Sequence, residues 1–177
     1  AYQGVFKNPL VAPDLLGVSS GACVGASVAI LLHLNSFGVQ AMAFVAGILA
    51  VGLTLFFPRL IKNTNMTMLV LSGIIVKGIM DSVMGIIKYV ADPETELQSI
   101  TYWQLGSLTK VLPKDLFTVG PVIVAASVII FLLRWRINIL SLGDREAKTL
   151  GVSVTVVRNF IIICATLLTA SAVCISG

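Results

Sequence analysis

The chain has 177 residues, of which 57% are hydrophobic and 11% charged, and its mean hydropathy is +1.00. Soluble domains carry about 25% charged residues, so the 12 basic and 8 acidic side chains here cannot cover a water-exposed surface of this size. The composition indicates a membrane protein, and it excludes a disordered segment, a nucleic-acid-binding module and a small disulfide-bonded scaffold.

Five apolar stretches are long enough to cross a bilayer, which takes about 20 helical residues. They are continuous and lack the alternation of barrel strands, and backbone polar groups in hydrocarbon must bond within their own segment. We therefore expect an all-α polytopic membrane protein, in a single domain, with spans over about 15–34, 39–60, 66–90, 116–133 and 154–176. Because the chain starts at Ala1 without an initiator methionine or signal peptide and stops at Gly177 after an apolar run, we expect an interior piece of a longer protein.

The segment before the first span is broken by prolines. Pro9 and Pro13 prevent a continuous helix. Gly17, Gly21 and Gly25 then recur every four residues, with Ser20 and two alanines beside them. Small residues at this spacing allow helix backbones to approach closely in lipid, so the pattern by itself indicates helix packing.

The third span contains two charged residues, Lys77 and Asp81, which lie four residues apart and so on one helix face. Charges inside a span are costly and usually face a bundle interior or a water-filled path. Ser82 and Gly85 lie beside them and would leave room for such a path. Two interpretations remain open: these four residues line a translocation pathway, or Lys77 and Asp81 form an intrahelical ion pair that serves packing only.

Residues 91–115 form a longer polar break with a helix signal at its start. Asp92 is expected as the N-cap, Pro93 at the first helical position and acidic residues in the first turn. We expect a short helix over about 93–108 that lies along the membrane surface. His33, the only histidine, falls at the end of a span and is expected to lie at the interface.

The distribution of Lys and Arg predicts the orientation. One side has a net charge of +5, from eight basic residues against three acidic ones: Lys7, Arg59, Lys62, Arg134, Arg136, Arg145, Lys148 and Arg158 against Asp14, Asp144 and Glu146. The other side has a net charge of −1, from Lys88, Lys110 and Lys114 against Asp92, Glu94, Glu96 and Asp115. The basic side, which includes residues 134–158, is expected to be cytoplasmic, and residues 91–115 are expected to be external.

The sequence contains no phosphate-binding glycine loop, HExxH pattern or nucleophile elbow. The three cysteines, Cys23, Cys164 and Cys174, lie in separate apolar runs without the spacing of metal ligands. We therefore expect neither a catalytic site nor a metal site nor a directly bound cofactor.

Four motifs, in order, resemble the membrane permeases of ABC importers for iron–siderophore, haem and cobalamin. The first is Asn8-Pro9-Leu10 with Pro13 and residues 16–22, and the second is Ala91-Asp92-Pro93 with residues 97–108. The third runs over 137–152, and the fourth over 166–177. The resemblance covers essentially the whole chain, and it implies about five spans of a fold with about ten.

The resemblance implies a transport subunit that moves a ferric siderophore, haem or cobalamin across the cytoplasmic membrane of a prokaryote. The expected partners are membrane lipids, a second permease subunit (an identical copy or a paralogue), two cytoplasmic ATP-binding subunits and an external solute-binding protein, with no nucleic acid. ATP would be hydrolysed by the separate ATP-binding chains. The signature residues carried over from the family are Asn8, Pro9, Pro13, Gly17, Ser20, Gly21 and Gly25.

The resemblance also implies a cytoplasmic coupling segment over about 137–153. A short helix between two glycine breaks could dock in a groove of the ATPase and transmit its closure. Its apolar contacts would come from Leu142, Ala147 and Leu150, and its rim charges include Asp144 and Glu146, between the breaks at Gly143 and Gly151. Without the resemblance, the same residues would be interpreted as an ordinary charged loop.

Two other classes of function are alternatives. A secondary, ion-coupled transporter would use Lys77 and Asp81 as its coupling site. A membrane-integral enzyme is disfavoured because the sequence has no catalytic constellation.

Overall fold

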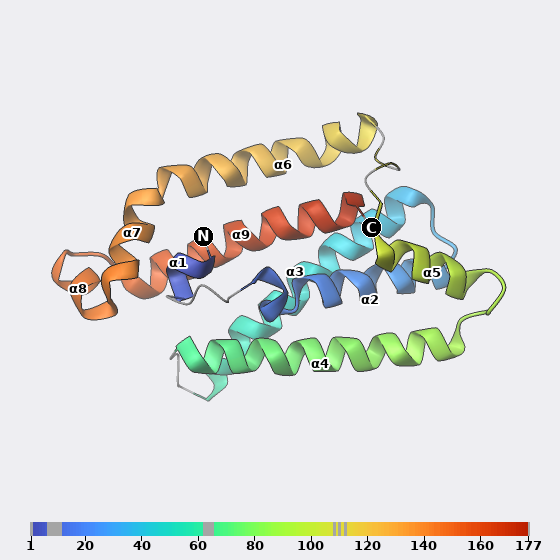
Figure 1. Ribbon diagram of the computed structural model, residues 1–177, viewed down its shortest axis with the longest axis horizontal. Helices are drawn as coiled ribbons and strands as arrows, with labels where there is room; N and C mark the ends of the chain where they lie inside the picture. Colours follow the sequence, from blue (N-terminus) through green and yellow to red (C-terminus); the bar gives the residue numbers. More distant parts are fainter. Residues whose placement is uncertain are drawn as a thin grey trace.

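The computed structural model describes residues 2–6, 12–61, 66–107, 109, 111 and 113–176. Every secondary-structure element assigned in these residues is a helix, as expected for the all-α class. The long helices run side by side, with α4 along one edge of the molecule and α6 along the opposite edge (Figure 1). The elements are α1 Tyr2–Phe6, the 3₁₀ helix η1 Pro13–Leu16, α2 Val18–Leu31, α3 Ser36–Leu60, α4 Met66–Val90, α5 Glu96–Leu105, α6 Pro113–Leu132, α7 Arg134–Leu142, α8 Asp144–Thr149 and α9 Val154–Ser176.

Among the described residues, three helices are long and apolar enough to cross a membrane: α3, α4 and α9. They fall on the spans expected at 39–60, 66–90 and 154–176. The expected span at 116–133 falls on α6, which bends by 53° into α7 and would make a fourth crossing if the pair is one broken span. The chain is therefore a multi-pass membrane protein.

The predicted helix over 15–34 is wrong at both ends. Residues 13–16 form η1, and Gly17 takes a left-handed φ of +77° before α2 begins at Val18. α2 has 14 residues, or about 21 Å of helix, which is shorter than the roughly 30 Å of a bilayer core. It ends with His33 in the left-handed region, where the amides of His33 and Leu34 donate to the carbonyls of Ile30 and Ala29.

α2 and α3 pack with their backbones in close approach. A Cβ added at Gly21 would lie 2.9 Å from the carbonyl oxygen of Ala46, and one at Gly25 would lie 2.6 Å from the Cβ of Ala46. Side chains at these two positions would therefore force the helices apart. The turn before α3 is capped by Asn35, whose side chain accepts a hydrogen bond of 2.8 Å from the amide of Gly38.

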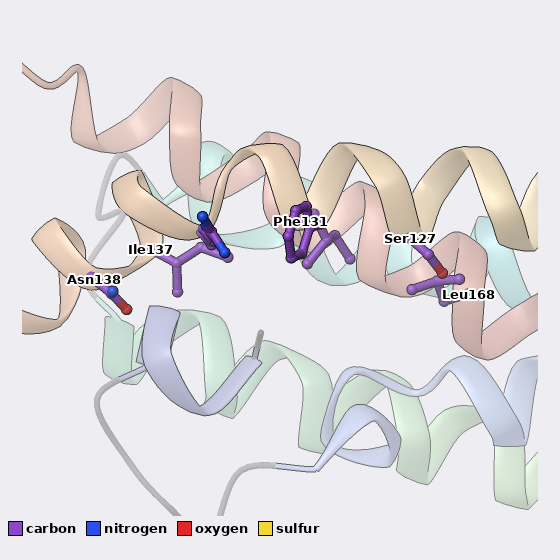
Figure 2. Close-up of a pocket in the computed structure, with 7 residues that line it drawn as sticks. Ser127, Phe131, Ile137, Asn138 and Leu168 are labelled. Carbon is purple, nitrogen blue, oxygen red and sulfur yellow. The ribbon is translucent and has the colours of Figure 1, made fainter.

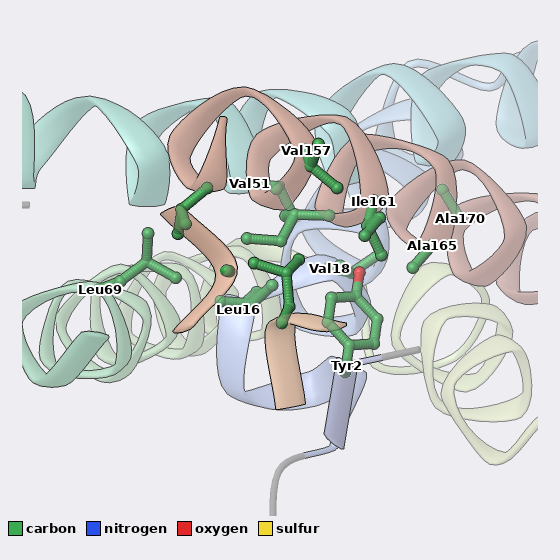
Figure 3. Packing of buried hydrophobic residues seen from close by; sticks show 13 residues of the cluster. Tyr2, Leu16, Val18, Val51, Leu69, Val157, Ile161, Ala165 and Ala170 are labelled. Atoms are coloured by element: carbon green, nitrogen blue, oxygen red, sulfur yellow. The ribbon is translucent and has the colours of Figure 1, made fainter. Parts of the chain in front are cut away.

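The main hydrophobic core surrounds η1 and the start of α2. Leu16 and Val18 are fully buried there beside Ile161 of α9, and Val51 and Leu69 close the cluster from α3 and α4 (Figure 3). α1 joins this core through Tyr2, whose hydroxyl lies 2.9 Å from the Oγ1 of Thr166. The end of η1 and the start of α2 are thus packed against α3, α4 and α9.

The predicted surface helix starts later than expected, at Glu96 rather than Pro93, and it ends at Leu105. The carboxylate of Asp92 accepts a hydrogen bond of 2.6 Å from the Thr95 hydroxyl, and the Asp92 amide donates to the Glu96 carboxylate at 3.0 Å. These bonds hold residues 93–95 in a turn, so Asp92 does not cap the helix. Gly106, with a φ of +72°, terminates it.

Candidate functional site

One face of α4 carries polar and small residues, and we call it the polar face of α4: Lys77, Gly78, Asp81, Ser82 and Gly85. The opposite face packs on η1, α2 and α3 through Leu69, Ser72, Gly73, Val76, Met84 and Ile87. Because α4 forms an edge of the molecule, the polar face is largely uncovered within this chain (Figure 1).

Lys77 forms its salt bridge with Asp14 of η1, not with Asp81. The exposed fractions of the two side chains are 37% for Lys77 and 44% for Asp14. The alternative of a self-neutralising intrahelical pair between Lys77 and Asp81 is therefore wrong. Asp14, which the charge distribution assigned to the cytoplasmic side, instead lies level with the middle of α4.

Two features hold η1, and with it Asp14, in place. Gly73 has no side chain, and a Cβ there would overlap the carbonyl oxygen of Leu15, so η1 can lie directly against α4. The buried hydroxyl of Thr54 donates to the Leu16 carbonyl at 3.0 Å. Irregular backbone at membrane depth needs such partners because lipid provides none.

Sequence reasoning missed Asp14, Thr54 and Gly73 as parts of this site. One signal was available. A lysine in the middle of a span needs a counter-ion, and Asp14 is an acidic residue next to Pro13, at the break before the first apolar span. Thr54 and Gly73 gave no comparable signal, because each acts only through contact with η1.

The rest of the polar face is open. Asp81 is exposed, and it makes no hydrogen bond or salt bridge with the described residues. The hydroxyl of Ser82 donates to the carbonyl of Gly78, one turn earlier, at 2.7 Å. A Cβ at Gly78 or Gly85 would meet no atom within 4 Å. The face therefore offers a carboxylate and a shallow, uncrowded surface.

The signature residues are partly described. Asn8 and Pro9 lie outside the described residues, and Pro13 is the first residue of η1. Gly17 occupies a left-handed conformation that favours glycine, and Ser20 is half-buried in α2. Gly21 and Gly25 lie at the contact with α3.

The expected coupling segment consists of the end of α7, α8 and the turn that follows. Gly143, with a φ of +153°, separates α7 from α8, which has six residues. Gly151 ends α8 in the left-handed region at φ +75°. There the amides of Gly151 and Val152 donate to the carbonyls of Lys148 and Ala147, which is the Schellman pattern.

Ala147 is fully buried in this chain's own core, so it cannot supply a contact to a partner as expected. Leu142 and Leu150 are 69% and 60% exposed, on either side of α8. Glu146 is exposed, and the side chain of Asp144 lies outside what the structure describes. The segment thus presents two uncovered leucines, while its centre is anchored by Ala147.

A cavity of about 410 Å³ lies between α6, α7 and α9 (Figure 2). Its walls are mainly apolar, and the guanidinium of Arg134 lies 4.6 Å from the ring centroid of Phe131 at the α6–α7 bend. It is lined by Ser127, Ile130, Phe131, Arg134, Ile137, Asn138 and Leu168. In the described part of the chain, no three His, Cys, Asp or Glu residues are grouped so that they could hold a metal ion.

Comparison with known proteins identifies the family. The FecCD transport family matches residues 1–177, which is the whole chain. The chain belongs to this family. It is 35% identical over 176 residues to the molybdate import system permease of Haemophilus influenzae, and 33% identical over 183 residues to the hemin transport system permease of Yersinia pestis. It is also 32% identical over 176 residues to the cobalamin import system permease of Halobacterium salinarum.

Each of these alignments covers 99% of this chain but only 52%, 54% and 47% of the respective relative. The chain spans about half the length of the curated relatives it matches. A solved structure described as a metal-chelate type ABC transporter in an inward-facing conformation has a TM-score of 0.93 and 33% identity, over 99% of this chain and 56% of that one. The FecCD chain therefore shares the fold of an ABC transporter permease, as the four sequence motifs implied.

Proposed function

We propose that this FecCD chain is part of the permease subunit of an ATP-driven importer for a metal chelate or related cargo, such as ferric siderophore, haem or cobalamin. The observation that carries the proposal is the match of the whole chain to one transport family and to an ABC transporter structure. The molybdate permease among its relatives extends the range of cargo to oxyanions.

In this proposal the polar face of α4 lines the translocation pathway. A salt bridge halfway along a span and an exposed carboxylate one turn away are costly against lipid and are stable against water. The cargo would be handled as an intact complex, with no cofactor bound by the permease.

We further propose that α8 and its flanking leucines dock on a separate ATP-binding subunit. Leu142 and Leu150 supply the apolar contacts, and Ala147 fixes the helix to the bundle. Without Asp14, the charge distribution of the sequence assigns eight basic residues against two acidic ones to the side of α7 and α8, and this charge excess favours a cytoplasmic location. A second permease subunit and an external binding protein would complete the importer.

Uptake in cells tests the proposed function. A strain that lacks the complete gene should lose ATP-dependent accumulation of one labelled cargo among ferric siderophores, haem, cobalamin and molybdate, and the restored gene should recover it. Uptake that survives loss of the ATP-binding subunit and follows an ion gradient would instead favour a secondary transporter.

A further inference from the structure

We propose that Asp81 gives the pathway a net negative charge at its middle, so that this permease favours cationic and neutral cargo over anionic cargo. This inference rests on the proposed function, because it assumes that the polar face of α4 contacts the pathway. It concerns the class of cargo, which the family alone leaves open, since the relatives include permeases for molybdate, haem and cobalamin.

Lys77 is paired with a residue outside its own helix. A lysine at mid-span would attract anions if it were free or paired only loosely with its neighbour. Here its ammonium group is bonded to the carboxylate of Asp14, which belongs to a separate element. The Thr54 bond to Leu16 and the close approach at Gly73 fix that element against α4. The positive charge of Lys77 is therefore neutralised from the side of the bundle.

Asp81 leaves one negative charge on the polar face of α4. Asp81 lies one turn from Lys77 on the same face, is exposed, and has no hydrogen-bond or salt-bridge partner among the described residues. The next basic residue along this face, Lys88, is seven positions further, or about 10 Å along the helix axis, and is partly buried near the helix end. The group of Lys77, Asp14 and Asp81 thus has a formal charge of −1.

The charge of Asp81 would act directly on cargo in the pathway. Ser82 and Gly85 place no large side chain between Asp81 and a molecule in the pathway, and the space beside Gly85 is open. A charge in a narrow passage with low-dielectric walls acts more strongly than one in bulk water. An anion that passes Asp81 meets repulsion, whereas a cation is attracted.

The local charge can be measured without knowing the cargo. In the full-length permease assembled with its partners in membranes, Cys23, Cys164 and Cys174 are replaced by alanine and Ser82→Cys is introduced. The reaction rates of a cationic and an anionic methanethiosulfonate reagent are then compared. We expect the ratio of the cationic to the anionic reaction rate at position 82 to exceed the ratio measured with a free thiol in solution. Asp81→Asn should lower this ratio by at least about threefold.

Two variants sharpen the test. Lys77→Gln should raise the cationic preference at position 82, because it leaves the Asp14 carboxylate unpaired beside Asp81. Thr101→Cys, on the exposed helix α5, is the matched control, and its rate ratio should not respond to Asp81→Asn.

An unreactive cysteine at position 82 would overturn the inference, since the face would then be covered by protein or lipid. A rate ratio equal to that of the free thiol, or one that Asp81→Asn leaves unchanged, would also overturn it. A cationic preference without ATP-dependent uptake of any cargo would contradict the proposed function alone. Uptake without the cationic preference would contradict this inference alone.

Discussion

At the scale of single residues, the pairing of Lys77 with Asp14 explains how a lysine is tolerated in the middle of an apolar helix. The two residues are 63 positions apart in the chain, and they join the irregular η1 to α4. Removing either partner leaves the other charge unpaired beside the packed bundle, where it is less well solvated than in bulk water. The bridge is therefore a structural link as well as a neutralising one.

We predict that Asp14→Asn destabilises the full-length permease by about 1–2 kcal/mol, because it leaves Lys77 without its counter-ion in a partly exposed setting. The double variant Asp14→Asn with Lys77→Gln should recover most of this loss. Thermal unfolding in detergent measures both.

Asp81→Asn is the control for that series. Because Asp81 has no bonded partner in the described part of the chain, its neutralisation should change the unfolding midpoint little. Equal destabilisation by Asp14→Asn and Asp81→Asn would contradict the assigned pairing.

At the scale of elements, the contact between α2 and α3 determines how closely the bundle packs, and the position of α8 determines which apolar residues stay uncovered. α2 begins at a left-handed glycine and packs its small residues directly on the backbone of α3. α8 is pinned by the buried Ala147, while the leucines at its flanks stay uncovered. The first contact resists deformation, and the second offers a surface for a partner.

Gly25→Ala is predicted to lower the free energy of unfolding by about 1–3 kcal/mol, because the added methyl group would overlap α3. Gly52→Ala in α3 is the matched control: the space around Gly52 is open, and alanine is the better helix former, so stability should stay equal or rise. Chemical or thermal unfolding measures the stability of both variants. A Gly25→Ala variant as stable as the unsubstituted protein would contradict the close packing.

Leu150→Glu is predicted to reduce ATP-driven uptake by at least about tenfold with little loss of stability, since this exposed leucine would contact the ATP-binding subunit. Thr149→Gln, at the adjacent exposed position, should leave uptake nearly unchanged. Ala147→Glu should instead impair folding, because its site is buried. Normal coupling in Leu150→Glu would reject the docking role of this segment.

The long helices follow from the sequence, whereas the breaks and the contacts between distant segments do not. Residues 39–60, 66–90 and 154–176 are predominantly apolar over the length of a span, which predicts helices there, and α3, α4 and α9 follow. The break at Gly17 was missed because Leu15, Leu16 and Val18 are as apolar as the helix itself. The partner of Lys77 and the burial of Ala147 depend on which elements meet in space, and spacing along the chain does not encode this.

At the scale of the whole molecule, charge and hydropathy combine into a polarised bundle. Asp92, Glu94 and Glu96 lie around the start of α5 at one end, and Arg134, Arg136 and Lys148 lie on α7 and α8 at the other (Figure 1). We predict that cysteines at exposed positions in α8 react only with reagents added to the cytoplasmic side, and that cysteines in α5 react only from outside. The opposite labelling pattern would contradict the proposed orientation.

We propose that this FecCD chain is part of a permease driven by a separate ATPase. The most direct measurement uses the full-length permease in proteoliposomes with its ATP-binding subunits and binding protein, and it follows cargo accumulation as ATP is supplied to the ATPase side. We predict accumulation that requires ATP hydrolysis and is lost with a hydrolysis-deficient ATPase. Accumulation without ATP or without the ATP-binding subunits would contradict the account.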